Sequence, residues 1–289
     1  MKVKDFDLRQ TLECGQCFNF ERIAENDYIV VAKGRMLHVS QFEDELRFEG
    51  ADEDEVSTVW IPYFDLQRDY GEIKSSVAKA DERLAPVVEK YHGIRLLNQD
   101  FPETLISFII SQNKSIPQIK RIVRNICSSY GNYAGSFSGR DYYSFPDAES
   151  RHLLTEDVFR ELKCGFRAPY LADGIRWLRE GAAAFGGEEG FEKRLRAMTF
   201  EQARNELMSI RGVGEKVASC VMLFSLGFRE AFPVDVWIKR IMEEMYFSRK
   251  ASRTEIENLA AEKFGVFGGY AQQYLFIHAR ENAGIMKKM

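Results

Sequence analysis

The hydrophobic pattern changes its period once along the chain, and this change limits the possible folds more than any other feature. Turn residues separate four short β-rich runs, at 17–23, 28–33, 37–41 and 45–49. From about Trp60 onward, apolar residues recur at helical spacing. We therefore predict an α+β fold, with an antiparallel β-sheet domain and flanking helices over 1–93 and a mostly helical region over 94–289.

The composition is that of an ordinary globular protein. Of 289 residues, 45% are hydrophobic and 29% are charged, which argues against a disordered or fibrous chain. No apolar run approaches the roughly 18 residues of a membrane span, and the N-terminus lacks the apolar stretch of a secretory signal. We expect a protein with no membrane partner, located in the cytoplasm, and in a prokaryote beside the nucleoid.

The five cysteines predict free thiols rather than disulfides or a metal site. Their number is odd, and the chain is long enough to fold without cross-links. Cys14 and Cys17 could form half of a zinc site, but no second cysteine pair or nearby histidine completes four ligands. We predict no metal and no cofactor.

The net charge of −4 gives no general attraction to nucleic acid, but one segment is locally basic. Residues 104–139 contain four lysine and arginine side chains and no Asp or Glu. Within this segment, a polar elbow (residues 111–115) separates two amphipathic helical patterns, and Pro117 suits the first turn of the second helix. The Gly-, Ser- and Tyr-rich stretch 134–144 predicts a surface loop.

Gly212, Val213 and Gly214 lie between two helical patterns, in a segment of about 207–225. The glycines allow a tight turn that leaves backbone N–H groups free at the start of the second helix, where a phosphate can approach. This pattern predicts a helix-hairpin-helix that binds DNA. An ordinary interhelical turn would have the same pattern.

Two polar residues near this hairpin are candidates for catalysis. Lys216 lies in the first turn of the second helix, where an amine could serve as a nucleophile, and Cys220 follows on the same helical face. Asp235 is placed like the N-cap of a later helix, and its carboxylate could face a developing positive charge. Taken singly, Lys216 could be a solvated lysine and Asp235 a plain cap.

Together with these residues, several motifs in order resemble the helix-hairpin-helix DNA glycosylases, and most closely the 8-oxoguanine DNA glycosylase/lyases. They lie at 12–18, 108–114, 164–167, 210–216, 233–235 and 269–276. The resemblance implies that Lys216 attacks the sugar C1′ and forms a Schiff base, and that Asp235 assists and stabilises the charged transition state.

The resemblance also assigns residues to the extruded base. The Gly15 carbonyl would accept a hydrogen bond from N7–H of 8-oxoguanine, Phe276 and Cys220 would sandwich the base, and Gln272 would read its Watson–Crick edge. Gln272 and Phe276 are four residues apart and so share one helical face, which agrees with these roles. In the structural alternative, Gly15 is a turn glycine, Phe276 a core aromatic and Gln272 a surface amide.

On the DNA side, the resemblance implies that Asn113 fills the space left by the extruded nucleotide, that Phe166 is a wedge and that Arg167 contacts the opposite base. Two positions depart from animal members of the family. Gln118 replaces a second arginine that contacts the opposite cytosine, and Trp237 replaces a histidine. No cysteine follows Cys220, which excludes the iron–sulfur cluster of endonuclease III-like relatives.

The function predicted from these residues is base excision repair. A monomeric enzyme would flip 8-oxoguanine out of duplex DNA, excise it through a lysine Schiff base and nick the abasic strand by β-elimination. Two alternatives remain at this point. One is a monofunctional glycosylase for alkylated bases, which would use Asp235 and water, and the other is a DNA-binding scaffold that has lost catalysis.

Overall fold

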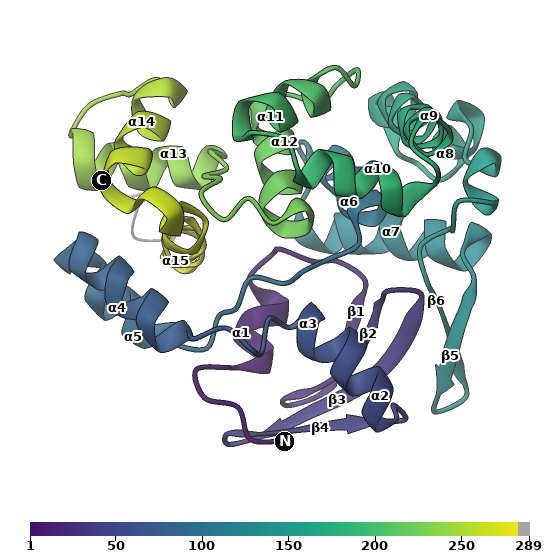
Figure 1. Cartoon of the computed structure of the whole chain (residues 1–289), viewed down its shortest axis with the longest axis horizontal. Helices are drawn as coiled ribbons and strands as arrows, with labels where there is room; N and C mark the ends of the chain where they lie inside the picture. The colour runs from purple at the N-terminus through teal and green to yellow at the C-terminus, as the bar shows by residue number, and fades with distance from the viewer. Residues whose placement is uncertain (283–289) are drawn as a thin grey trace.

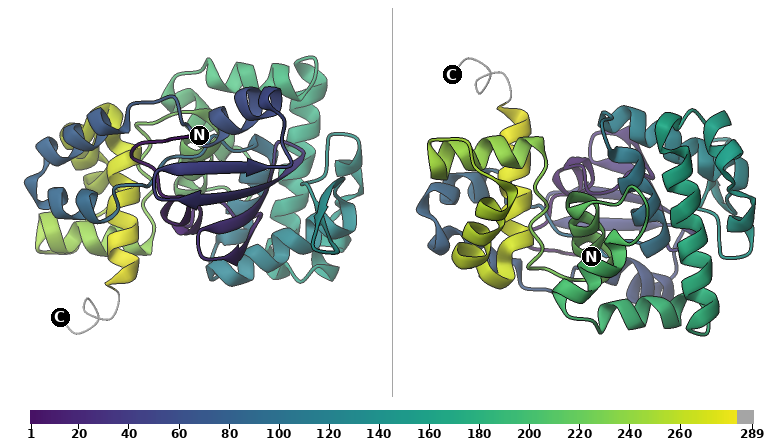
Figure 2. Two further views of the ribbon diagram at one scale, coloured as in Figure 1. Left: turned by 90° about the horizontal axis from the view of Figure 1, so that it is seen from below. Right: turned by 90° about the horizontal axis from the view of Figure 1, so that it is seen from above.

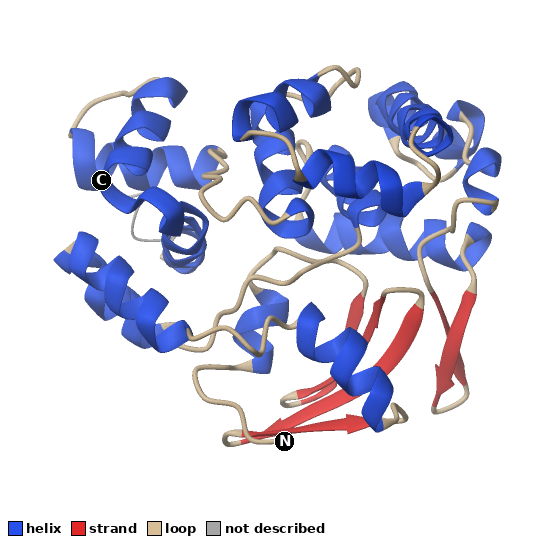
Figure 3. Cartoon of the chain, in the orientation of Figure 1, coloured by secondary structure: helices blue, strands red, loops and turns tan. Residues whose placement is uncertain are grey.

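The computed structural model describes residues 1–282, so the end of the predicted helical region, 283–289, lies outside the described residues. The N-terminal part forms one antiparallel sheet whose strands follow chain order (Figures 1 and 3). The strands are β1 (Phe20–Ala24), β2 (Asp27–Ala32), β3 (Arg35–Phe42) and β4 (Glu45–Glu49). This meander followed by helices confirms the α+β prediction.

One face of the sheet packs on short helices. Alternate residues of the central strands, among them Tyr28, Val30 and Val39, are buried in a core with Leu12 and Trp60, because alternate side chains of a strand point to the same face. The helices on this side are α1 (Leu8–Glu13), α2 (Glu53–Glu55) and α3 (Ile61–Tyr63).

Two further groups of helices lie on either side of the sheet (Figures 1 and 2). The first group contains α6 (Phe101–Ser111), α7 (Ile116–Tyr130), α8 (Glu156–Glu161), α9 (Ala168–Ala184), α10 (Glu188–Arg196), α11 (Phe200–Met208) and α12 (Glu215–Val221). The second contains α4 (Tyr70–Ala80), α5 (Ala85–Lys90), α13 (Val236–Met242), α14 (Arg253–Phe264) and α15 (Gly268–Glu281).

The helices α4 and α5 precede the predicted boundary at residue 93, yet they pack on α14 and α15 near the end of the chain (Figure 1). Their buried residues, including Ile73, Val77 and Val88, belong to the hydrophobic core of the helical region. The core of the sheet is separate and contains Phe64 and Leu97. The two cores are therefore not divided at one point of the sequence, because Phe64 and Leu97 of the sheet core lie on either side of α4 and α5. The predicted domain limits stay a prediction.

The stretch predicted as a surface loop, 134–144, is instead a hairpin of β5 (Tyr133–Phe137) and β6 (Arg140–Tyr143). Ser138 and Gly139 form its two-residue turn and both have positive φ, 49° and 77°, which suits the twist of a hairpin. A Cβ on Gly135 would lie 2.9 Å from the Met36 side chain, so this glycine lets the hairpin approach β3. The prediction of a loop is wrong because Gly and Ser residues with positive φ also form the tight turn of a hairpin.

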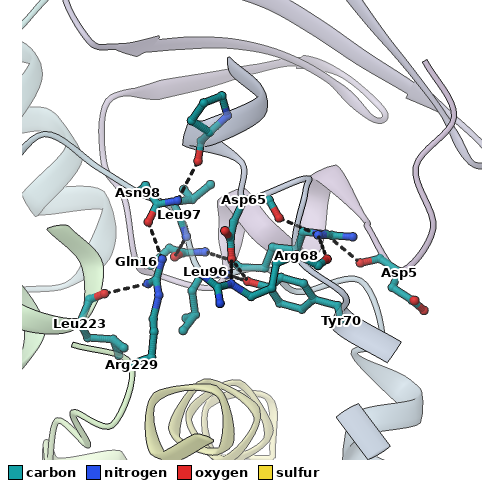
Figure 4. Close-up of polar contacts among 12 residues, drawn as sticks. Asp5, Gln16, Asp65, Arg68, Tyr70, Leu96, Leu97, Asn98, Leu223 and Arg229 are labelled. Carbon is teal, nitrogen blue, oxygen red and sulfur yellow. Dashed lines mark hydrogen bonds and ion pairs between the residues drawn. The ribbon is translucent and has the colours of Figure 1, made fainter. Parts of the chain in front are cut away.

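An extended segment, 94–99, connects the two cores and is held by buried polar groups (Figure 4). The Leu97 N–H donates to Oε1 of Gln16 at 2.9 Å, and Gln16 Nε2 donates to the Arg95 carbonyl at 2.7 Å. Arg229, from the helical region, donates to the Asn98 side chain at 2.5 Å and to the Leu223 carbonyl. Because Gln16 is fully buried, these bonds fix the loop that precedes β1 against the connection.

Candidate active site

A cavity of about 380 Å³ lies between the two groups of helices, and residues from five parts of the chain line it. The loop before β1 provides Gly15, α6 and the polar elbow provide Ser111 and Lys114, and α12 provides Lys216 and Cys220. The α13 side provides Asp235 and Trp237, and α15 provides Gln272, Gln273, Phe276 and Arg280. A wider groove of about 720 Å³ shares Lys216 and Asp235 with this cavity, and Asn113 and Gln118 lie along it. We call it the outer groove.

The amine of Lys216 is held at the mouth of the cavity. Its Nζ donates to Oγ of Ser111 at 3.1 Å, and it lies 5.1 Å from the centre of the Phe108 ring. Both contacts come from the end of α6, so the packing of α6 on α12 positions this amine. The Lys216 side chain lines both the cavity and the outer groove.

The helix-hairpin-helix predicted at about 207–225 consists of α11 and α12 with the turn 209–214 between them. Gly212 has φ +83°, and a Cβ there would lie 2.3 Å from the Tyr170 ring, so only glycine fits. Val213 is buried, and Gly214 is exposed at the N-cap of α12. The Gln112 side chain donates to the Gly212 carbonyl at 3.1 Å, which ties the polar elbow to the hairpin.

Asp235 is the N-cap of α13, and its carboxylate also lines the cavity. One oxygen accepts the backbone N–H groups of Trp237 and Ile238, both at 2.9 Å. Burial raises the pKa of this carboxyl above its usual value, although the backbone N–H groups and the positive charge of Lys216 act in the opposite direction. The cap bonds fix one oxygen, and the side chain is held beside the Lys216 amine.

Sequence reasoning missed Arg253, which contacts the residues that directly precede the two candidate catalytic residues. Its guanidinium contacts the Glu215 carboxylate at 3.2 Å and donates to the Val234 carbonyl at 3.0 Å. Glu215 directly precedes Lys216, and Val234 directly precedes Asp235. An arginine 18 residues beyond Asp235 gives no local signal in the sequence, because the contact depends on how α14 packs.

The inner end of the cavity has the residues predicted for a flipped base. Gly15 has φ +94°, and a Cβ there would lie 3.3 Å from the Phe276 ring, so a side chain would intrude between the loop and this aromatic. Cys220 is buried, and burial raises the pKa of its thiol to about 11, which keeps it neutral. Arg280, also missed, donates to the Glu13 carbonyl at 2.8 Å and so holds this loop against α15.

Comparison with known proteins agrees with this arrangement. Residues 1–105 match the family described as the 8-oxoguanine DNA glycosylase N-terminal domain, and residues 106–265 match the HhH-GPD superfamily of base excision DNA repair proteins. The chain belongs to the 8-oxoguanine DNA glycosylase/lyases. It is therefore a bifunctional enzyme of base excision repair, with a helix-hairpin-helix and a DNA partner.

Three relatives illustrate the similarity of this glycosylase to known members. A probable N-glycosylase/DNA lyase of Methanothermobacter thermautotrophicus is 32% identical over 249 residues, which cover 78% of this chain and 75% of that protein. The structure of MBOgg1 with a low-affinity DNA ligand is 40% identical, with a TM-score of 0.90 over 97% of this chain and 94% of that one. The Clostridium acetobutylicum 8-oxoguanine glycosylase/lyase, bound to DNA with cytosine opposite 8-oxoG, is 39% identical, with a TM-score of 0.90 over 96% and 93% of the two chains.

The DNA-facing residues predicted for the glycosylase are not all brought together. Asn113 lies on the outer groove, is exposed and has a positive φ of 54°. Phe166 is 59% exposed but does not line the groove. Arg167 is 3% exposed, and its guanidinium donates to the carbonyls of Gln112 and Cys164. Arg167 therefore supports the polar elbow from behind, and its predicted contact with the opposite base stays a prediction.

Gln118 lies on the outer groove of the glycosylase, but part of its amide is already engaged. It is the third residue of α7, and its Oε1 accepts the Ser115 backbone N–H at 3.0 Å in a capping box. The Nε2 group remains as a donor toward the groove. Trp237 lines both the groove and the cavity from the first turn of α13.

No group of three or more His, Cys, Asp or Glu side chains within residues 1–282 could hold a metal ion. The Cys14 thiol of the suggested half zinc site is buried and donates to the Thr11 carbonyl. In the same residues, no helix of the glycosylase is long and apolar enough to span a membrane.

Proposed function

We propose that this enzyme removes 8-oxoguanine from duplex DNA by covalent catalysis on Lys216 and then cleaves the strand. The observation that carries the proposal is that one cavity brings together an amine, a carboxylate and a base-sized recess. Lys216 and Asp235 lie at its mouth, and Gly15, Cys220 and Phe276 form its inner end. A flipped nucleotide would place its sugar beside the amine and its base between the sulfur and the ring.

The proposed chemistry needs only this chain and water. After giving up a proton to water, the Lys216 nitrogen forms a bond to C1′ of the deoxyribose as the C1′–N9 bond breaks, and the leaving base takes the proton that the newly bonded nitrogen then releases. The Asp235 carboxylate stabilises the positive charge that develops on the sugar. Opening of the sugar ring gives a Schiff base, loss of a C2′ proton expels the 3′ phosphate oxygen, and water then releases the lysine.

The Gly15 carbonyl gives the site its proposed preference for the oxidised base. The 8-oxoguanine base carries N7–H, which this carbonyl can accept, whereas N7 of guanine is itself an acceptor and would oppose it. This group is supplied by the backbone, so its position depends on the loop. The contacts of Gln16 to the connecting segment and of Arg280 to the Glu13 carbonyl hold that loop.

All of these residues come from one chain, so we expect the enzyme to act as a monomer. Its action on DNA and its free thiols also fit a cytoplasmic location, beside the nucleoid in a prokaryote. The two alternatives differ from this proposal in what they require of Lys216, because neither an alkylbase glycosylase that uses water nor a scaffold needs an amine in the cavity.

Borohydride trapping on a duplex with 8-oxoguanine opposite cytosine tests the proposal. The wild-type protein should give a covalent protein–DNA adduct, and Lys216→Gln should give none while still binding the duplex. Lys114 is the other lysine of the cavity, so Lys114→Gln should still form the adduct. Release of the base without an adduct would favour the monofunctional alternative, and binding with no release would favour the scaffold.

A further inference from the structure

Two neighbouring glutamine side chains of α15 are buried beside the base cavity and form a chain of hydrogen bonds. Gln272 is 4% exposed and Gln273 is 3% exposed, and both line the cavity. Gln273 Nε2 donates to Oε1 of Gln272 at 2.9 Å, and Gln272 Nε2 donates to the Pro233 carbonyl at 3.1 Å. Pro233 lies two residues before Asp235.

The donors and acceptors in this chain fix the direction of both amides. A backbone carbonyl can only accept, so the NH₂ end of Gln272 must face Pro233. The oxygen of Gln272 then faces Gln273, which must present its own NH₂ end. If the Gln272 amide turned over, an oxygen would face the Pro233 carbonyl and two NH₂ groups would face each other.

The Gln273 amide is not explained by stability. Its Oε1 is buried and has no hydrogen-bond partner within the described residues. A buried acceptor without a partner destabilises the fold, and an apolar side chain of similar size would avoid that penalty. Within residues 1–282, the only hydrogen bond of this side chain is the one that its Nε2 donates to Gln272.

We propose that Gln273 is a positioning residue that determines which base edge the cavity accepts. It holds the Gln272 oxygen in place as an acceptor, whose second lone pair can receive N1–H or the amino group of a guanine-type base. Adenine-type bases carry an acceptor at N1 and would require the amide to turn over. This inference rests on the proposed function, since it assumes that the cavity receives a flipped base.

The test compares two lesions that differ only at the Watson–Crick edge. Both 8-oxoguanine and 8-oxoadenine carry N7–H and the 8-oxo group, so the Gly15 contact is the same for both. The measurement is the ratio of single-turnover excision rates for the two lesions, each opposite cytosine. Gln273→Met removes the orienting donor at similar volume, and Gln273→Glu replaces it by an acceptor of the same shape.

We expect the preference for 8-oxoguanine over 8-oxoadenine to fall about tenfold or more in Gln273→Met, and further in Gln273→Glu, because a base-edge contact of this kind is worth about 1–3 kcal/mol. Tyr274→Phe is the matched control. It removes a buried hydroxyl that, like the Gln273 amide oxygen, has no hydrogen-bond partner within the described residues. Tyr274 lies on the same helix and does not line the cavity. This control should keep the wild-type ratio.

A merely structural role predicts a different outcome. If Gln273 only filled space, a folded variant would lose rate equally on both lesions and the ratio would stay within about threefold of wild type, which would overturn the inference. If one variant fails to fold, as judged by its thermal melt, the other still gives the ratio. Borohydride trapping on a duplex that already has an abasic site needs no base recognition, so it should be unchanged in both variants.

The same measurements separate this inference from the proposed function. A wild-type protein with no activity on 8-oxoguanine would contradict the proposed function itself. An active wild-type protein whose ratio survives both substitutions would contradict only the role of Gln273.

Discussion

The base cavity and the outer groove share Lys216 and Asp235, but they are built in different ways. In the cavity, the recognition groups are buried and already fixed by the protein, as the Gln272 amide and the Gly15 loop are. In the outer groove, Asn113 is exposed, and the oxygen of Gln118 caps its own helix. Arg167, behind the elbow, is bonded to backbone carbonyls.

This difference indicates where binding energy is used. A preorganised cavity recognises a base without ordering its own side chains, which favours accurate discrimination. The groove must order exposed side chains on DNA, so part of its contact energy offsets that loss of freedom. We therefore expect substitutions in the cavity to change rate and selectivity, and substitutions at the groove to change DNA affinity and base extrusion.

The largest effect is expected at Asp235, which belongs to both regions. Asp235→Asn should keep duplex affinity and lose about 100- to 1000-fold in single-turnover excision rate, because a neutral amide cannot stabilise the positive charge on the sugar. Asn can retain the N-cap bonds, so the fold should be preserved. A rate close to wild type would show that the carboxylate is only a helix cap.

A smaller effect is expected from removing one of two aromatic side chains, Phe276 in the base cavity or the exposed Phe166 that is predicted to face DNA. Phe276→Ala should lower excision about tenfold or more while leaving affinity for undamaged duplex unchanged, because a stacking contact of about 1–3 kcal/mol is made only with the extruded base. Equal losses in both assays would instead identify Phe276 as a core residue.

Phe166→Ala is the counterpart among the residues predicted to face DNA, although Phe166 does not line the outer groove. Its ring is exposed, so truncation should leave stability unchanged, reduce excision of 8-oxoguanine, and spare borohydride trapping at a preformed abasic site, where little unstacking is needed. Fluorescence of a 2-aminopurine next to the lesion would measure extrusion. Unchanged extrusion would remove Phe166 from the wedge role.

The base opposite the lesion should matter only modestly. Gln118 offers one donor group to the groove, in place of the bidentate donors of an arginine, and Arg167 is buried in the DNA-free protein. We expect 8-oxoguanine to be removed opposite all four bases, with rates within about tenfold of one another, since one bidentate contact of about 1–3 kcal/mol is missing. Single-turnover rates on four duplexes that differ only in the opposite base would test this. A steep preference for cytosine would mean that Arg167 moves out to contact the opposite base, or that another residue contacts it.

The smallest effect concerns how the stability of the folded protein depends on pH. Burial raises the pKa of Asp235, so the folded protein binds that proton more tightly than the unfolded chain does. The contribution of this one carboxyl to the free energy of unfolding is therefore fully present below the unfolded pKa of about 3.9 and is lost as the pH rises through the folded value. Asp235→Asn lacks this loss and should melt at a higher temperature than wild type at pH 7, with the gain disappearing near pH 4. A lower melting temperature at pH 7 would contradict it.

The sequence was most informative where a pattern is local. The meander, the hairpin glycines, and the capping position of Asp235 follow from spacing and residue type, and the structure has them near the predicted positions. Contacts that depend on packing between distant helices were not predictable. Arg253 reaches Glu215, and α4 and α5 join the helical core, only because of how α14 and α15 pack.

The buried contacts of Gln16 have a consequence for what an incompletely folded molecule can do to DNA. The loop that carries the Gly15 carbonyl is fixed by the segment that joins the two cores (Figure 4). A molecule in which residues 94–99 had not packed against Gln16 would still have Lys216 and the hairpin, yet these contacts of its recognition loop would be missing. The Gly15 carbonyl is therefore in place only when the connecting segment has packed against its loop. We expect a partly folded molecule to be unable to select a base, and so not to cut intact DNA.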